Sequence, residues 1–147
     1  MTLIQTVRDY IASCPLLEND AILGIDKLGS KGIAYTIDAI PSDPVVKRYT
    51  DGSQMRQFQF VFASRQYYGM NVIENLENSG FYENFVDWIE RNNEKGLSNF
   101  INLGMDRKAL TIEINSAPYV YDAEENTARY QVQLSLKYYQ SWRYYHG

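Results

Sequence analysis

The sequence has one cysteine, Cys14, and one histidine, His146, in 147 residues. A single cysteine cannot form an intrachain disulfide, and a zinc site needs several His or Cys ligands. A Ser-His-Asp or Cys-His catalytic site would have to use His146. His146 stands next to the C-terminus, where order is least expected. Cys14 stands before Pro15 at a helix end, which is typical of a small buried hydrophobic residue rather than a nucleophile. We therefore predict a protein that is not an enzyme, with no catalytic residue, no cofactor and no metal.

Long apolar segments are also missing. No run of about 18 apolar residues occurs, and the start, MTLIQTVRDYIASC, has no basic leader followed by a long apolar stretch. We therefore expect a protein that is made in and stays soluble in a cytoplasm, with no membrane partner. The net charge of −4 gives no general attraction to nucleic acid. With 45% hydrophobic and 22% charged residues, the chain has the composition of a folded protein, and residues 1–147 suit a single domain.

Hydrophobic spacing predicts the elements of the N-terminal half. An amphipathic helix begins after Thr2 as N-cap and ends before Pro15, with an apolar stripe formed by Leu3, Ile4, Val7 and Ile11. A connector containing Gly24 and Gly29 follows. Its segment GIDKLGSKG has serine before lysine, the reverse of a phosphate-binding loop, and is interpreted as a turn. Alternation over residues 32–40 then predicts a strand that ends before two prolines.

Residues 44–62 predict a hairpin followed by a core strand. Asp51-Gly52 is the dipeptide expected where a turn needs a positive φ. Phe58, Phe60 and Phe62 share one face of the next strand, opposite Gln57, Gln59 and Val61. Burial of each phenylalanine contributes roughly 1.5–3 kcal/mol, so we assign the phenylalanine face to the core.

The C-terminal half predicts helices and then two strands. Residues 70–96 indicate two helices separated at Ser79-Gly80, the second ending at Gly96. In the strand at 109–115, Leu110, Ile112 and Ile114 alternate. The last strand has the cleanest alternation, with an inward set of Tyr130, Val132, Leu134, Leu136 and Tyr138.

The predicted order is therefore α-β-β-α-α-β-β. It favours an α+β domain with a mostly antiparallel sheet of four or slightly more strands and helices on one face.

Thirteen tyrosines and a local group of basic residues are the features that suggest an interaction surface. Tyrosine favours strands, but it is also enriched where proteins meet. The basic residues are Lys47, Arg48, Arg56 and Arg65, and Tyr49, Tyr67 and Tyr68 are interspersed among them. This composition fits a protein interface or a single-strand nucleic-acid surface, and the acidic net charge favours the protein interface. The acidic run Asp122, Glu124 and Glu125 lacks the donors and the glycine turn of a calcium loop and is interpreted as a solvated loop.

Three segments resemble a family of small proteins of tailed bacteriophages and of prophages of Gram-positive bacteria. The segments are DPVVKRYTDGSQMRQFQFVFASRQYYG, ENSGFYENFVDWIE and DAEENTARYQVQLSLKYYQ, within residues 31–140. Members are labelled minor capsid or tail proteins and are similar to the tail terminators of long-tailed phages.

The resemblance implies a structural subunit of the virion neck that forms a ring, expected to be six-membered, on the head-proximal end of the tail tube. It implies three partners: further copies of the chain, the tail tube protein and the head-tail connector protein. Specific nucleic-acid binding is not expected. Other neck or tail-completion proteins share the same small α+β fold and stay as alternatives.

A closed ring repeats one heterologous contact, so each subunit needs two different complementary patches. We expect one patch at the basic, aromatic hairpin, including Asp51 of its turn, and the other at the acidic stretch Asp122 to Glu125. A small-ligand domain that uses an aromatic pocket is a competing hypothesis, as is nucleic-acid binding through Arg48, Arg56 and Arg65.

Overall fold

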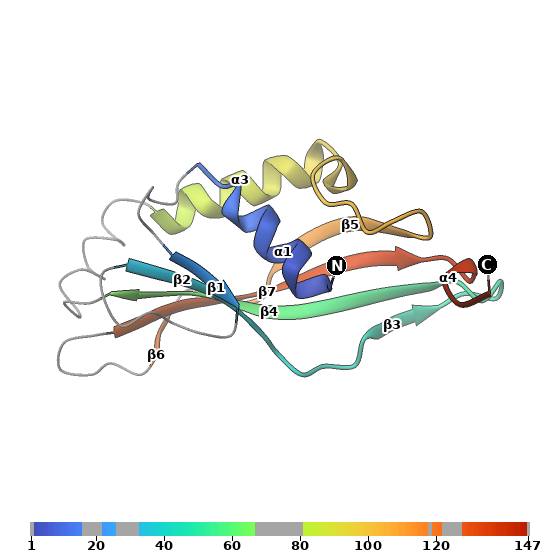
Figure 1. Ribbon diagram of the computed structural model, residues 1–147, viewed down its shortest axis with the longest axis horizontal. Coiled ribbons are helices and arrows are strands. Elements are labelled where there is room, and N and C mark those ends of the chain that lie inside the picture. The colour runs from blue at the N-terminus through green and yellow to red at the C-terminus, as the bar shows by residue number, and fades with distance from the viewer. Residues whose placement is uncertain are drawn as a thin grey trace.

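The computed structural model describes residues 2–15, 22–25, 33–66, 81–117, 119–121 and 128–146. These residues form an α+β fold, as the sequence predicts, with the helices α1 and α3 on the same side of one sheet (Figure 1). The centre of the sheet consists of β4 (Gln54–Gln66) and β7 (Ala128–Gln140), which pair antiparallel along their full 13-residue lengths. We call the side of the sheet that carries α1 and α3 the helix face.

The other strands flank this central pair. β2 (Ile33–Ala39) and β3 (Val45–Arg48) both pair antiparallel with β4, one after the other along the same edge. β5 (Arg107–Ile114) and β6 (Tyr119–Tyr121) pair antiparallel with β7 on its other side. β1 (Ile22–Ile25) pairs with β2 and is parallel to it. The prediction of a connector around Gly24 was therefore wrong, because a four-residue strand is too short to reveal an alternation.

The core lies between the helix face and the two longer helices. Cross-strand pairs of β4 and β7 place phenylalanines opposite aliphatic residues, for example Phe60 opposite Leu134 and Phe62 opposite Val132. Phe60 and Leu134 are fully buried, and Phe85 of α3 (Phe81–Glu94) meets the Phe62 ring edge-on with centroids 4.7 Å apart. The predicted core face is thus confirmed. Tyr130 belongs to the predicted inward set, but its side chain lies outside the described part of the structure.

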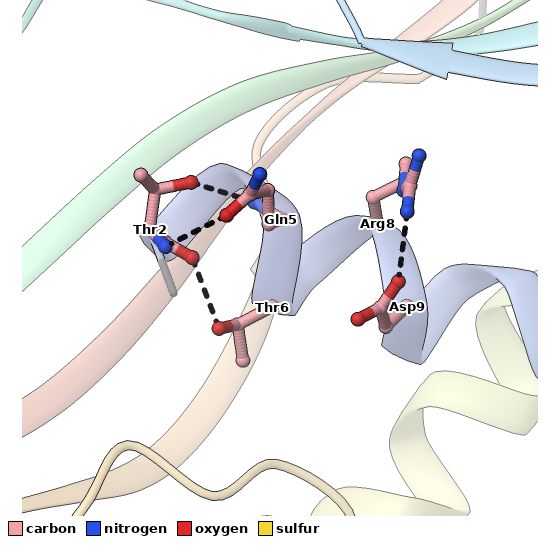
Figure 2. Close-up of polar contacts among 5 residues, drawn as sticks. All are labelled: Thr2, Gln5, Thr6, Arg8 and Asp9. Atoms are coloured by element: carbon pink, nitrogen blue, oxygen red, sulfur yellow. Dashed lines mark hydrogen bonds and ion pairs between the residues drawn. The ribbon is translucent and has the colours of Figure 1, made fainter.

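The first helix, α1 (Leu3–Ala12), begins where the sequence predicts. Thr2 and Gln5 form a capping box (Figure 2): the Gln5 backbone N–H donates to Thr2 Oγ1 at 3.2 Å, and the Thr2 N–H donates to Gln5 Oε1 at 3.0 Å. The Thr6 hydroxyl donates to the Thr2 carbonyl. These bonds satisfy backbone groups that a helix start leaves without intrahelical partners.

A buried tyrosine joins the two longer helices. Tyr10 of α1 stacks on Trp88 of α3 with ring centroids 4.8 Å apart. Its hydroxyl accepts a hydrogen bond of 3.0 Å from Asn92 Nδ2. Because an unpaired buried hydroxyl would cost free energy, the hydrogen bond from Asn92 lowers the cost of burying Tyr10.

Loss of stability in alkaline solution should depend on Tyr10. Burial raises the pKa of Tyr10 from 10.0 to about 12, although the hydrogen bond from Asn92 acts in the opposite direction. The unfolded chain releases the phenolic proton first, so Tyr10 lowers the free energy of unfolding as pH rises from 10 towards 12. In urea titrations, Tyr10→Phe should be less stable at neutral pH yet lose less stability across this window. An equal alkaline loss in both proteins would contradict the prediction.

The strand β5 departs from its predicted pattern. The predicted alternation places Leu110 on the same face as Ile112 and Ile114, but Leu110 is 36% exposed, and Ala109 is buried instead. The register against β7 shifts between Ala109 and Thr111, which is the signature of a β-bulge with Leu110 as the extra residue. Ile112 is buried as predicted and Ile114 packs against the core.

The predicted helical region is only partly described. α3 begins directly after the predicted break at Ser79-Gly80, whereas the first predicted helix, residues 70–78, lies outside the described residues. Gly96 has φ 95° and precedes a short 3-10 helix, η1 (Leu97–Asn99). The chain ends with a short helix, α4 (Arg143–His146).

Candidate functional site

The hairpin formed by β3 and β4 closes with the turn that the sequence predicts. The Gly52 N–H donates to the Tyr49 carbonyl at 3.1 Å, and the Tyr49 N–H donates to the Ser53 carbonyl at 2.9 Å. Gly52 has φ 90°, the region that favours glycine. A Cβ atom at Gly52 would also lie 3.2 Å from Cβ of Trp142. The turn is therefore packed against the C-terminal segment.

Side-chain hydrogen bonds hold this turn on the sheet. The Tyr139 hydroxyl of β7 donates to Ser53 Oγ at 2.7 Å, and Ser53 is 2% exposed. The Ser53 backbone N–H donates to Asp51 Oδ1 at 2.9 Å. Hydrogen bonds from Ser53, first from its backbone and then from its hydroxyl, hold the pKa of Asp51 below its usual value. Asp51 thus helps to fix the turn and presents its charge at the tip.

The first arm of the hairpin presents four consecutive exposed residues, which we call the β3 edge: Val46, Lys47, Arg48 and Tyr49. The register against β4 shifts between Val45 and Lys47, so Val46 is the extra residue of a β-bulge. Lys47 Nζ lies 5.4 Å from the centroid of the Tyr49 ring, within cation–π range. The exposure predicted for Lys47, Arg48 and Tyr49 is therefore found in the structure.

Arg48 and Arg56 lie on one face of the sheet, because Arg48 pairs opposite Gln54, two residues before Arg56. Arg56 follows the same alternation as Phe58, so this is the helix face, where Arg56 is partly buried. Its Nη1 donates to Gln54 Oε1 at 2.8 Å, and its buried Nε has no hydrogen-bond partner among the residues that the structure describes. Lys47 pairs opposite Met55 and therefore lies on the opposite face. The sequence-predicted group of basic residues is thus divided between two faces of the sheet.

The remaining predicted interface residues cannot be placed beside this hairpin. The backbone of Arg65 pairs in β4, but its side chain lies outside the described part of the structure. The others fall entirely outside the described residues: Tyr67, Tyr68, Asp122, Glu124 and Glu125.

The C-terminal segment adds a second aromatic element that the sequence analysis missed. The Ser141 N–H donates to the Asp106 carbonyl at 2.8 Å, which ties this segment to the start of β5. The Arg107 guanidinium carbon lies 4.7 Å from the centroid of the Tyr144 ring. Trp142 and Tyr144 nevertheless stay 43% and 44% exposed. The sequence SWRYY contains the signal, since arginine among exposed aromatic residues is typical of interfaces.

These segments meet at one end of the sheet, where the turn between β3 and β4 packs against the segment that follows β7 (Figure 1). We call this region the hairpin end; it comprises the β3 edge with Met105, Leu110, Trp142 and Tyr144. Of the seven large hydrophobic residues that are exposed in the described chain, all except Phe100 belong to it. Residues 43–56, 105–110 and 138–146 hold six lysines or arginines and three aspartates, in a chain of net charge −4. The hairpin end is therefore apolar and locally basic.

A second feature is an open hollow of about 500 Å³ between α1 and the loop after η1. Its polar side chains are already engaged: Thr6 with the Thr2 carbonyl, Asp9 with Arg8, and Asn102 with the Gly104 N–H. A small-molecule site usually directs polar groups to a common point. This hollow therefore gives the small-ligand hypothesis no specific support.

The described residues contain no group of three or more His, Cys, Asp or Glu side chains that could hold a metal ion. None of their helices is long and apolar enough to cross a membrane.

The chain was also compared with known proteins. It matches no model of a protein family, and no functionally curated protein matches it significantly. The functional interpretation therefore depends on the sequence motifs and on the hairpin end itself.

Proposed function

We propose that this chain is a non-enzymatic assembly protein of a tailed bacteriophage, a tail terminator that forms a ring on the tail tube and offers a docking surface to the head. The observation that carries the proposal is the hairpin end. There, exposed apolar residues occur on β3, around the start of β5 and in the C-terminal segment, and β3 adds the cations Lys47 and Arg48. Exposed apolar patches rimmed by polar residues mark protein interaction sites.

Burial of the hairpin end in a ring would explain its composition. A monomer in water gains nothing from exposing Val46, Met105 and Trp142 together, whereas a subunit contact removes such side chains from water. The hydrogen bonds that link Tyr139, Ser53 and Asp51 fix the turn before any partner binds. Association therefore costs little ordering of this surface.

One partner of the hairpin end is a second copy of the chain, since a ring is built from repeated contacts between copies. The tail tube protein and the head-tail connector protein would bind the two faces of the ring. The protein would be assembled in the bacterial cytoplasm and would stay in the neck of the virion.

Deletion of the gene from its phage tests the proposed function. Terminator loss should yield tails of uncontrolled length or tails that fail to join heads, as seen by electron microscopy of lysates. Expression of the intact chain from a plasmid should restore infectious particles. Normal titres and normal particles without the gene would refute the proposal.

A further inference from the structure

We propose that the β3 edge of one copy binds the outer face of α3 on a neighbouring copy. This inference rests on the proposed function, because it specifies which two surfaces meet in the ring. It replaces the acidic acceptor predicted from sequence, Asp122 to Glu125, with a surface that the structure describes.

The outer face of α3 is acidic, and its negative charge complements the positive charge of the β3 edge. Four exposed carboxylates, which we call the α3 stripe, follow the spacing i, i+4, i+7, i+11: Glu83, Asp87, Glu90 and Glu94. At about 100° per residue they lie within about 60° of one another around the helix. Phe85 and Ile89 of the same helix are buried on the opposite side. The α3 stripe therefore points away from the core.

The α3 helix carries four carboxylates and one cation, Arg91, which stands four residues after Asp87. Like charges four residues apart destabilise a helix, and the α3 stripe contains two such pairs, Glu83 with Asp87 and Glu90 with Glu94. Glu94 also ends the helix, where the dipole favours a cation. Among the described residues, the ion pairs join Arg8 with Asp9 and Lys137 with Glu113, and none involves the α3 stripe. A cationic strand laid along this helix would relieve the repulsion.

At two edges of the sheet, side chains of the same chain already bond backbone groups, which favours contact between copies through side chains rather than through strand pairing. On β5, Asn93 of α3 donates to the Ile112 carbonyl at 2.9 Å and accepts from the Ile112 N–H at 3.1 Å. At the start of β3, the Val45 N–H donates to Asp43 Oδ1 at 3.0 Å. These side chains occupy backbone groups that an added strand would need. A neighbouring copy must therefore use side chains at these positions.

The two surfaces lie on different parts of the subunit. β3 follows the outer edge of β4 at one end of the sheet, whereas α3 lies over the helix face, with Phe85 against Phe62 and Asn93 at β5 (Figure 1). The β3 edge consequently cannot reach the α3 stripe of its own chain. Four strand residues span about 13 Å, and the eleven-residue rise of the α3 stripe is about 16 Å. Surfaces of matching length and opposite charge on different parts of the subunit give the head-to-tail contact that a ring repeats.

Crosslinking between two single variants tests the contact without altering its charges. Val46→Cys places a thiol on the β3 edge, and Asn84→Cys places one at another exposed site of α3, about 60° around the helix from Asp87. The native Cys14 can stay because it is 5% exposed and a buried thiol reacts poorly. When the two variants are mixed at high concentration with a short bis-maleimide, we expect about tenfold more crosslinked dimer than from Val46→Cys mixed with Ser98→Cys. Adding Asp87→Lys and Glu90→Lys to the Asn84→Cys chain should reduce the yield to that of the Ser98→Cys control.

The outcomes separate the contact from the ring. Equal yields for positions 84 and 98 would overturn the proposed contact. So would a higher yield for Ala123→Cys, which stands in the acidic stretch predicted from sequence. Either result would leave the proposed tail-terminator role untouched. That role is tested separately by the gene deletion, which is scored by the morphology of the particles.

Discussion

Phe60→Ala is expected to lower the free energy of unfolding by about 3–5 kcal/mol. Phe60 is fully buried on β4, opposite Leu134 of β7 and beside Phe58, whose ring centroid is 5.8 Å away. Alanine would lose the burial of the ring and leave a cavity between the central strands and the helices. Because small domains are stable by about 5–15 kcal/mol, a change of this size removes a large share of the total.

Urea unfolding followed by circular dichroism measures this loss, and Phe100→Ala is the matched control. Phe100 undergoes the same chemical change but is 45% exposed, so we expect it to cost less than about 1 kcal/mol. A variant too unstable to purify would still agree with the prediction. Equal losses in the two variants would contradict the assignment of the phenylalanine face of β4 to the core.

The central strands were predictable because each has a long, regular alternation. β4 and β7 run for 13 residues each, and their inward positions are filled by large apolar residues such as Phe62 and Leu136. A strand of this length repeats its pattern enough times to fix which face is buried. The α1 start was predictable for a local reason, since Thr2 and Gln5 form a capping box within four residues.

The features that the sequence did not reveal depend on contacts between distant residues. The β-bulge at Leu110 depends on the register of β5 against β7, and the residues next to Leu110 contain no pattern that predicts it. The short strand β1 forms by pairing with β2, because four residues carry too little pattern to specify a strand. The capping of β5 by Asn93 joins residues 19 positions apart. Such pairings are decided by tertiary packing rather than by local preference.

The candidate site was predictable in part for the same reasons. The Asp51-Gly52 turn and the exposure of Lys47, Arg48 and Tyr49 follow from turn chemistry and polarity. The division of the basic residues between faces required the register, since the bulge at Val46 changes the side on which the following residues lie. The contribution of Trp142 required the return of the C-terminus to the hairpin turn.

Arg48→Glu should leave the fold intact and weaken assembly strongly. Arg48 is exposed, and no described residue forms an ion pair with it, so the free energy of unfolding should change by less than about 0.5 kcal/mol. A glutamate at this position would instead place like charges across each subunit contact. Such a juxtaposition costs several kcal/mol, so the contact should weaken by about a hundredfold. Because a ring repeats the contact in every copy, complementation of a gene deletion by this variant should largely fail.

Lys95→Glu is the control for the change in charge. Lys95 is exposed beyond the end of α3, about 110° around the helix from the α3 stripe, and its reversal changes the net charge by the same amount. This variant should complement the deletion as well as the unaltered chain. If Arg48→Glu restored infectious particles equally well, the β3 edge would not be a subunit contact. If Arg48→Glu instead unfolded in less urea, Arg48 would have a structural role, and its exposure would not reflect a binding surface.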